Sequence, residues 1–188
     1  MRASSLLVFV CALAGGCALN RPDHFYVLDS EHAKVLEPRS AFRLQVSLRV
    51  SLPTLVDRSE MVLVNPDGVR IFEHERWAAP LAEQFAGVLG QDIEARREDV
   101  ILASRSIAQP GTPTTSIAID VVQLSLQKGT GARLEARWRL QVGDSEKIAQ
   151  GRETFVAPAS DASFDGLAQS LSACIGLLAD RLVAELPR

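Results

Sequence analysis

This sequence has few cysteines, one tyrosine and no excess of positive charge. The 188 residues include three cysteines and one tyrosine, and aromatic residues make up 5% of the chain. A small disulfide-held fold is excluded, because such scaffolds are dense in cysteine. The formal net charge is −3, from 20 basic and 23 acidic residues. Without a basic excess or a large basic patch, the sequence argues against nucleic acid as a partner.

The first apolar run of the chain is too short to cross a membrane. Arg2 precedes an apolar run from Leu6 to Ala14, and Gly15 and Gly16 follow it. A membrane-spanning helix needs about 20 apolar residues. A basic start, a short apolar run and small residues at its end are instead typical of a secretory signal peptide. We therefore predict that residues 1–16 are a signal peptide.

A cysteine directly after this segment makes the prediction more specific. The run from Leu13 to Cys17, Leu-Ala-Gly-Gly-Cys, resembles a bacterial lipobox, in which cleavage precedes a cysteine that is then lipidated. It departs from the usual pattern at Ala14, three residues before the cysteine, where a large aliphatic residue is common. The alternative is an ordinary signal peptide followed by an incidental cysteine.

Lipidation of Cys17 would tie the mature chain to a membrane. One acyl chain binds only weakly, so stable anchoring takes more than one, and bacterial lipoproteins carry several on the one cysteine. Ala18 follows Cys17, and by the sorting rule for such lipoproteins the absence of aspartate there indicates the periplasmic side of the outer membrane. Residues 17–23 are predicted to be the tether. Cys11 leaves with the signal peptide, so Cys174 has no partner for an internal disulfide.

Residues 24–188 have the length and composition of one folded domain. Over the whole chain, apolar residues make up 47% and charged residues 23%, both ordinary for a globular protein. Strict alternation of apolar and polar residues predicts half-buried strands at 42–50 and 134–142. An Asn-Pro-Asp-Gly turn at 65–68 predicts a hairpin between the apolar runs 61–64 and 69–73. Further strands are predicted at 24–28, 100–102, 116–127 and 146–156.

Two segments have the spacing of three and four residues that places apolar side chains on one helix face. The first is 79–96, with Pro80 in its first turn, where no amide bond is lost. The second follows Ser163, a suitable N-cap. Its apolar stripe comprises Phe164, Leu167, Leu171, Cys174, Ile175, Leu178 and Leu182. The other side carries few basic residues, so we predict a core helix rather than a membrane-binding one.

These elements predict an α+β fold, with a mostly antiparallel sheet and two helices packed on one face. No catalytic or metal-binding motif accompanies them. His24, His32 and His74 lack the spacing of metal ligands, and no nucleophile elbow or phosphate-binding glycine loop is found. Cys174 could be a nucleophile, but its place on the apolar stripe favours a buried small hydrophobe. We predict no enzyme activity, cofactor or metal. The sequence does not exclude a catalytic acid–base pair formed by residues that are far apart in the chain.

Two segments, 52–61 and 74–81, are harder to explain as scaffold. The conservative interpretation is a surface loop with an Asp57–Arg58 pair, and a core anchor at Trp77. The functional interpretation is that both segments lie together at one end of the sheet and contact a partner.

The same two segments resemble those of the ABC-type transport auxiliary lipoproteins, the paraquat-inducible PqiC-like family. The segments that carry the resemblance are Leu-Pro-Thr-Leu-Val-Asp-Arg at 52–58, followed by Met-Val at 61–62, and Trp-Ala-x-Pro-Leu at 77–81. The first is one residue shorter than the family pattern Leu-Pro-x-x-Leu-x-Asp-Arg. The resemblance spans about the whole mature chain, including Tyr-Val-Leu at 26–28, with its specific motifs within 52–89.

That resemblance implies a non-enzymatic periplasmic component that accompanies MCE-domain proteins and ABC transporters moving lipids between the two membranes. It implies docking to an MCE-domain protein and a ring-like homo-oligomer, and it brings no catalytic residues. Our docking candidates are Pro53, Asp57, Arg58, Arg76 and Trp77. Two alternatives stay open. A lipopolysaccharide-assembly or other outer-membrane lipoprotein would share the tether and the α+β body, whereas a periplasmic hydrolase would need a nucleophile with a base.

Overall fold

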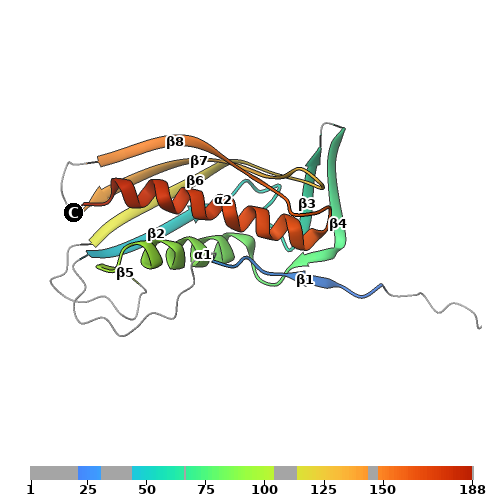
Figure 1. Cartoon of the computed structure of the whole chain (residues 1–188), viewed down its shortest axis with the longest axis horizontal. Helices are drawn as coiled ribbons and strands as arrows, with labels where there is room; N and C mark the ends of the chain where they lie inside the picture. Colours follow the sequence, from blue (N-terminus) through green and yellow to red (C-terminus); the bar gives the residue numbers. More distant parts are fainter. Residues whose placement is uncertain (1–20, 31–43, 66, 104–113, 144–147, 188) are drawn as a thin grey trace, which may run out of the picture.

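A computed structural model describes residues 21–30, 44–65, 67–103, 114–143 and 148–187. The predicted signal peptide, Cys17, most of the tether, His32 and Phe42 lie outside these residues. Within them the chain forms eight strands and two helices (Figure 1). Their bounds are β1 His24–Tyr26, β2 Leu44–Ser51, β3 Glu60–Asn65, β4 Gly68–Trp77, α1 Leu81–Arg96, β5 Val100–Leu102, β6 Thr114–Gln127, β7 Gly131–Val142, β8 Ile148–Pro158 and α2 Phe164–Glu185.

The strands form two mixed sheets rather than one mostly antiparallel sheet. The larger has the order β5-β2-β6-β7-β8, and the smaller has the order β1-β4-β3. Strand β2 is parallel to both of its neighbours, β5 and β6, and β1 is parallel to β4. The segment between β2 and β5 contains a hairpin and α1, which is long enough for the crossover that parallel pairing requires. The predicted α+β class is confirmed, with this correction to the pairing.

The predicted hairpins are confirmed. Strands β3 and β4 are antiparallel, with Asn65 opposite Gly68 in the register. Gly68 has φ +125°, a conformation that residues with a Cβ rarely adopt. Strands β6, β7 and β8 form the predicted antiparallel meander.

Both helices pack on the same face of the larger sheet, as predicted (Figure 1). Helix α2 begins at the expected cap, where the Gly166 N–H donates to Ser163 Oγ at 2.9 Å. Its apolar stripe is buried except for Phe164, which is half-buried and packs edge-on against Phe72 with ring centroids 4.9 Å apart. Full burial of one leucine or isoleucine of this stripe contributes about 1.5–3 kcal/mol to stability. Among the described helices, α2 is long and apolar enough for a membrane span, but here that stripe covers the sheet.

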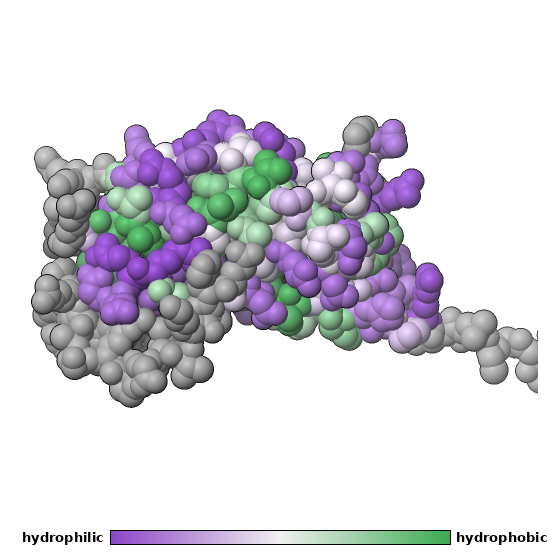
Figure 2. Space-filling model, viewed as in Figure 1, coloured by the Kyte–Doolittle hydropathy of each residue, from purple (hydrophilic) through white to green (hydrophobic). Residues whose placement is uncertain are grey.

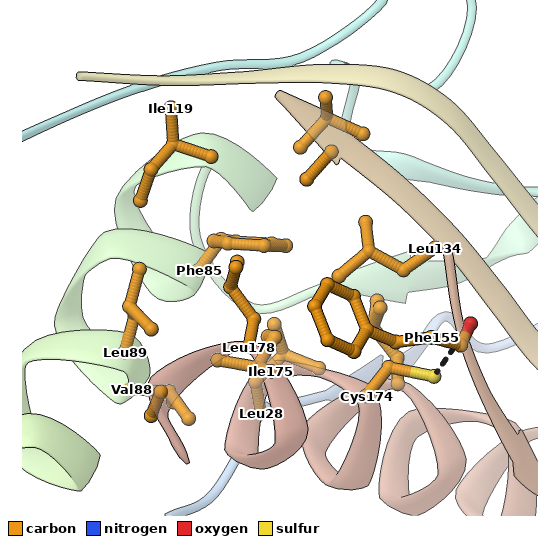
Figure 3. Packing of buried hydrophobic residues seen from close by; sticks show 14 of the residues in the cluster. Leu28, Phe85, Val88, Leu89, Ile119, Leu134, Phe155, Cys174, Ile175 and Leu178 are labelled. Atoms are coloured by element: carbon orange, nitrogen blue, oxygen red, sulfur yellow. Dashed lines mark hydrogen bonds between the residues drawn. The ribbon is translucent and has the colours of Figure 1, made fainter. Parts of the chain in front are cut away.

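Helix α1 starts one residue later than Pro80, which occupies its N-cap position. Its buried face, including Phe85 and Leu89, meets Ile175 and Leu178 of α2 and the inner face of the sheet (Figure 3). This continuous core fixes the two helices to the sheet. On the surface seen from this side, hydrophobic side chains gather only in separate patches among hydrophilic ones (Figure 2).

Candidate functional site

The two segments that the sequence singles out lie side by side. The loop between β2 and β3 leads into the start of β3, and this point meets the end of β4. The Trp77 N–H donates to the Ser59 carbonyl at 2.7 Å, and Arg76 Nη2 donates to Ser59 Oγ at 2.7 Å. The hairpin β3–β4 brings them together, because its two ends return to the same place.

The loop at 52–59 has a defined conformation. The Pro53 carbonyl accepts from the N–H groups of Val56 at 2.9 Å and Asp57 at 3.0 Å. The Val56 side chain, 5% exposed, joins the core, while Leu55 and Asp57 remain exposed on the loop surface. Pro53 therefore organises the turn through its carbonyl, and Val56 anchors it.

A carboxylate at the start of β3 holds two guanidinium groups. Glu60 Oε2 lies 2.8 Å from Arg58 Nε, and Glu60 Oε1 lies 3.7 Å from Arg76 Nη2. The hydrogen bond from Arg58 is the main reason that the pKa of Glu60 is lowered. Arg58 is therefore paired with Glu60, and the conservative expectation of an Asp57–Arg58 pair is wrong. Sequence reasoning missed Glu60, although it stands only two residues after Arg58, at the start of β3.

An exposed aromatic residue on β1, Phe25, lies next to the ion-pair cluster of Glu60 and its two arginines. Arg76 is the register partner of Glu60 on one side and of Phe25 on the other. Register partners point to the same face of a sheet, so Glu60, Arg76 and Phe25 form one row. The Phe25 side chain is 64% exposed. We call Phe25, Asp57, Arg58, Glu60 and Arg76 the tether-side surface.

Strand β1 is fixed to β4 on both sides of Phe25. The Tyr26 hydroxyl donates to Glu75 at 2.6 Å, and His74 Nδ1 lies 2.9 Å from Asp23. Burial and the neighbouring Glu75 raise the pKa of Tyr26, which keeps its hydroxyl protonated as a donor. The end of the predicted tether is thereby held against the sheet beside the tether-side surface.

Trp77 is a core residue, as the conservative interpretation expects. Its side chain is 3% exposed, so its indole ring is not available for direct contact with a partner. A role in docking would have to be indirect, through the position of the Trp77 backbone beside Ser59.

Cys174 is likewise part of the core. Its thiol is fully buried, with the Ala132 carbonyl at 3.5 Å and the Phe155 carbonyl at 3.7 Å (Figure 3). Burial raises the pKa of Cys174 to about 11, so the reactive thiolate is disfavoured at neutral pH. The prediction of a structural thiol is confirmed. Within the described ranges, no group of three or more metal-ligating side chains comes together.

Comparisons with known proteins give a family and a fold. The sequence model of the ABC-type transport auxiliary lipoprotein component matches residues 26–183. No curated protein sequence matches the chain significantly. A crystal structure of an uncharacterized protein is similar at 14% identity and a TM-score of 0.70, over 89% of this chain and 100% of that one. Protein XCC0632 from Xanthomonas campestris, assigned to the family DUF330, is similar at 15% identity and a TM-score of 0.58, over 85% of this chain and 92% of that one.

Proposed function

Because this chain belongs to the family of ABC-type transport auxiliary lipoprotein components, we propose that it is an outer-membrane-anchored, non-enzymatic subunit of an MCE-type lipid transport system. In this role it acts by contact with an MCE-domain protein in the periplasm. The match over residues 26–183 supports the transport role, and the lipobox-like sequence before Cys17 supports the anchor.

The tether sets where contact can occur. Cys17 precedes Phe25 by eight residues, and an extended chain spans at most about 3.3–3.6 Å per residue. With acyl chains on Cys17, the tether-side surface would lie within about 30 Å of the membrane. A partner that reaches this surface must therefore approach the anchoring membrane closely.

The observation that carries the docking proposal is the row formed by Glu60, Arg76 and Phe25. Glu60 holds the two guanidinium groups in position, and Phe25 exposes 64% of its side chain beside them. Aromatic residues and arginine are enriched at protein interfaces and at the positions that dominate binding. Pre-positioned arginines lose less conformational freedom on binding, so this surface suits a protein partner.

Substitution of Cys17 by serine tests the anchor. We expect the Cys17→Ser protein to move from the membrane fraction to the soluble periplasm and to lose its transport function. An acylated peptide at Cys17 in the wild type, identified by mass spectrometry, would accompany this result. Retention of function in the soluble form would contradict the need for a tether.

Two matched pairs of variants test docking. Phe25→Ser and Arg76→Gln alter the tether-side surface, whereas Val69→Ser and Arg70→Gln alter exposed residues at the other end of β4. We expect the first pair to weaken binding to the MCE-domain protein about tenfold each, equivalent to ~1.4 kcal/mol, and the second pair to leave it unchanged. Equal effects of both pairs, at unchanged melting temperature, would contradict this site. The ring-like homo-oligomer stays a prediction, which sedimentation of the detergent-solubilised protein can check.

A further inference from the structure

The larger sheet has a hollow on the face that carries no helix. Its volume is about 750 Å³, and its lining includes Arg49, Ser51, Ala118, Asp120, Arg137 and Arg139. This volume falls within the range of about 300–1,000 Å³ that is typical of small-molecule sites. We call this feature the arginine hollow.

The strand register shows why these side chains share one face. Arg49, Ala118, Arg139 and Gln150 are successive partners across β2, β6, β7 and β8. Their neighbours along the strands, Ile119 and Trp138, are buried in the core under the helices. Successive side chains of a strand point to opposite faces, so the row through Ala118 faces away from the helices.

Two of the arginines in the hollow have no counter-charge within the described part of the chain. Arg137 is paired with Asp120, which also accepts from Ser51 Oγ at 3.2 Å. On the same face, Arg152 is paired with Glu135 at 2.6 Å. Arg49 and Arg139 are exposed and form no ion pair or hydrogen bond with any described residue. The uncompensated charge is thus concentrated on either side of Ala118.

The spacing of these two arginines suits one anion between them. Neighbouring strands lie about 4.7–4.9 Å apart, so the Cα atoms of Arg49 and Arg139, two strands apart, are separated by about 10 Å. The small Ala118 side chain between them leaves space above the sheet. Guanidinium groups form paired hydrogen bonds with carboxylate and phosphate oxygens. A tetrahedral phosphate presents oxygens in several directions and can accept from both arginines at once.

We infer that the arginine hollow binds a phosphate group, as a soluble phosphate ester or as the headgroup of an anionic phospholipid, through Arg49 and Arg139. Gln150, exposed at the end of the same row, supplies an uncharged donor. The hollow lies on a different sheet from the tether-side surface. Phosphate binding here and docking there are therefore separable, and either can fail alone.

Titration of the full chain in a neutral detergent, followed by amide NMR shifts, tests this inference. The probes are inorganic phosphate, glycerol 3-phosphate, a short-chain phosphatidylglycerol and a glutamate-rich peptide, each at low ionic strength because salt screens exposed charges. The variants are Arg49→Gln and Arg139→Gln. Arg133→Gln is the matched control, because Arg133 lies on the same face of β7, exposed and outside the hollow. Thermal melts check that each variant is folded.

We expect saturable shifts at Ala118 and Arg139 with the phosphate probes. Arg49→Gln and Arg139→Gln should each weaken binding at least tenfold, and Arg133→Gln should not change it. Tighter binding of the phosphatidylglycerol than of glycerol 3-phosphate by tenfold or more assigns a lipid headgroup, and equal binding assigns a soluble ester. Absence of saturable phosphate binding, unchanged affinity in both variants, or binding of the glutamate-rich peptide alone would overturn the inference.

Discussion

Substitution of Ser170 by alanine tests how α2 is fixed to the larger sheet. The Ser170 side chain is 2% exposed. Its hydroxyl accepts from the Ala132 N–H at 2.7 Å and donates to the Ala157 carbonyl at 2.5 Å. Ala132 and Ala157 are register partners in β7 and β8, so one helix hydroxyl joins two strands.

Removal of this hydroxyl leaves a buried N–H and a buried carbonyl without their partner. A typical hydrogen bond contributes about 0.5–1.5 kcal/mol, and an unsatisfied buried group costs about 1–3 kcal/mol. The higher helix propensity of alanine offsets about 0.5 kcal/mol. We expect the free energy of unfolding to fall by about 2 kcal/mol, and the Tm by about 4–8 °C for a chain of this size.

Denaturant unfolding of Ser170→Ala, followed by circular dichroism, measures this loss. Gln169→Ala is the matched control, because Gln169 is the exposed neighbour on the same helix. Faster hydrogen exchange at the Ala132 amide should accompany the loss of stability. A change below about 0.5 kcal/mol, the usual range for surface substitutions, would refute the reasoning.

Three further predictions concern the strand ends, the buried thiol and Glu60. At Gly131, φ is +127° and an added Cβ would lie 2.1 Å from the Ala157 carbonyl oxygen, so Gly131→Ala should lower the free energy of unfolding by more than about 2 kcal/mol in denaturant. Cys174, with its pKa raised to about 11 by burial, should react with a thiol reagent at pH 8 only as fast as the protein unfolds, and rapid labelling of the native state would contradict this. The pKa of Glu60 is lowered from 4.5, mainly by the Arg58 hydrogen bond. Its contribution to stability is therefore present above pH 4.5 and is lost as the pH falls through the lowered pKa. Glu60→Gln should lose this part of the acid dependence, as measured by denaturation midpoints at about pH 6 and about pH 3.

Local patterns in the sequence predict most of the secondary structure. Alternation marks β2 and β7, and helical spacing marks α1 and α2, because each depends on residues that are close in the chain. Pairing of β2 with β5 and β6 depends on segments far apart in sequence, so the two mixed sheets do not follow from local patterns.

The same limit applies to the candidate sites. The motifs at 52–58 and 77–81 identify the segments that meet, and Trp77 is buried as its conservative interpretation expects. The sequence does not reveal Arg76 beside Glu60, or Phe25 beside Arg76, because the register of β4 with β3 and β1 creates these neighbours. In the sequence, Arg49 and Arg139 are ordinary polar positions of two predicted strands. Only the strand register shows that they lie on either side of Ala118.

Site-specific photo-crosslinking in intact cells tests the central claim most directly. A photoreactive residue replaces Phe25 on the tether-side surface, and in a control it replaces Val69, an exposed residue at the far end of β4. We expect the probe at position 25 to form an adduct with an MCE-domain protein, and to lose it when Cys17 is replaced by serine. An adduct of equal yield from position 69, or none from position 25 while transport continues, would contradict docking through this surface.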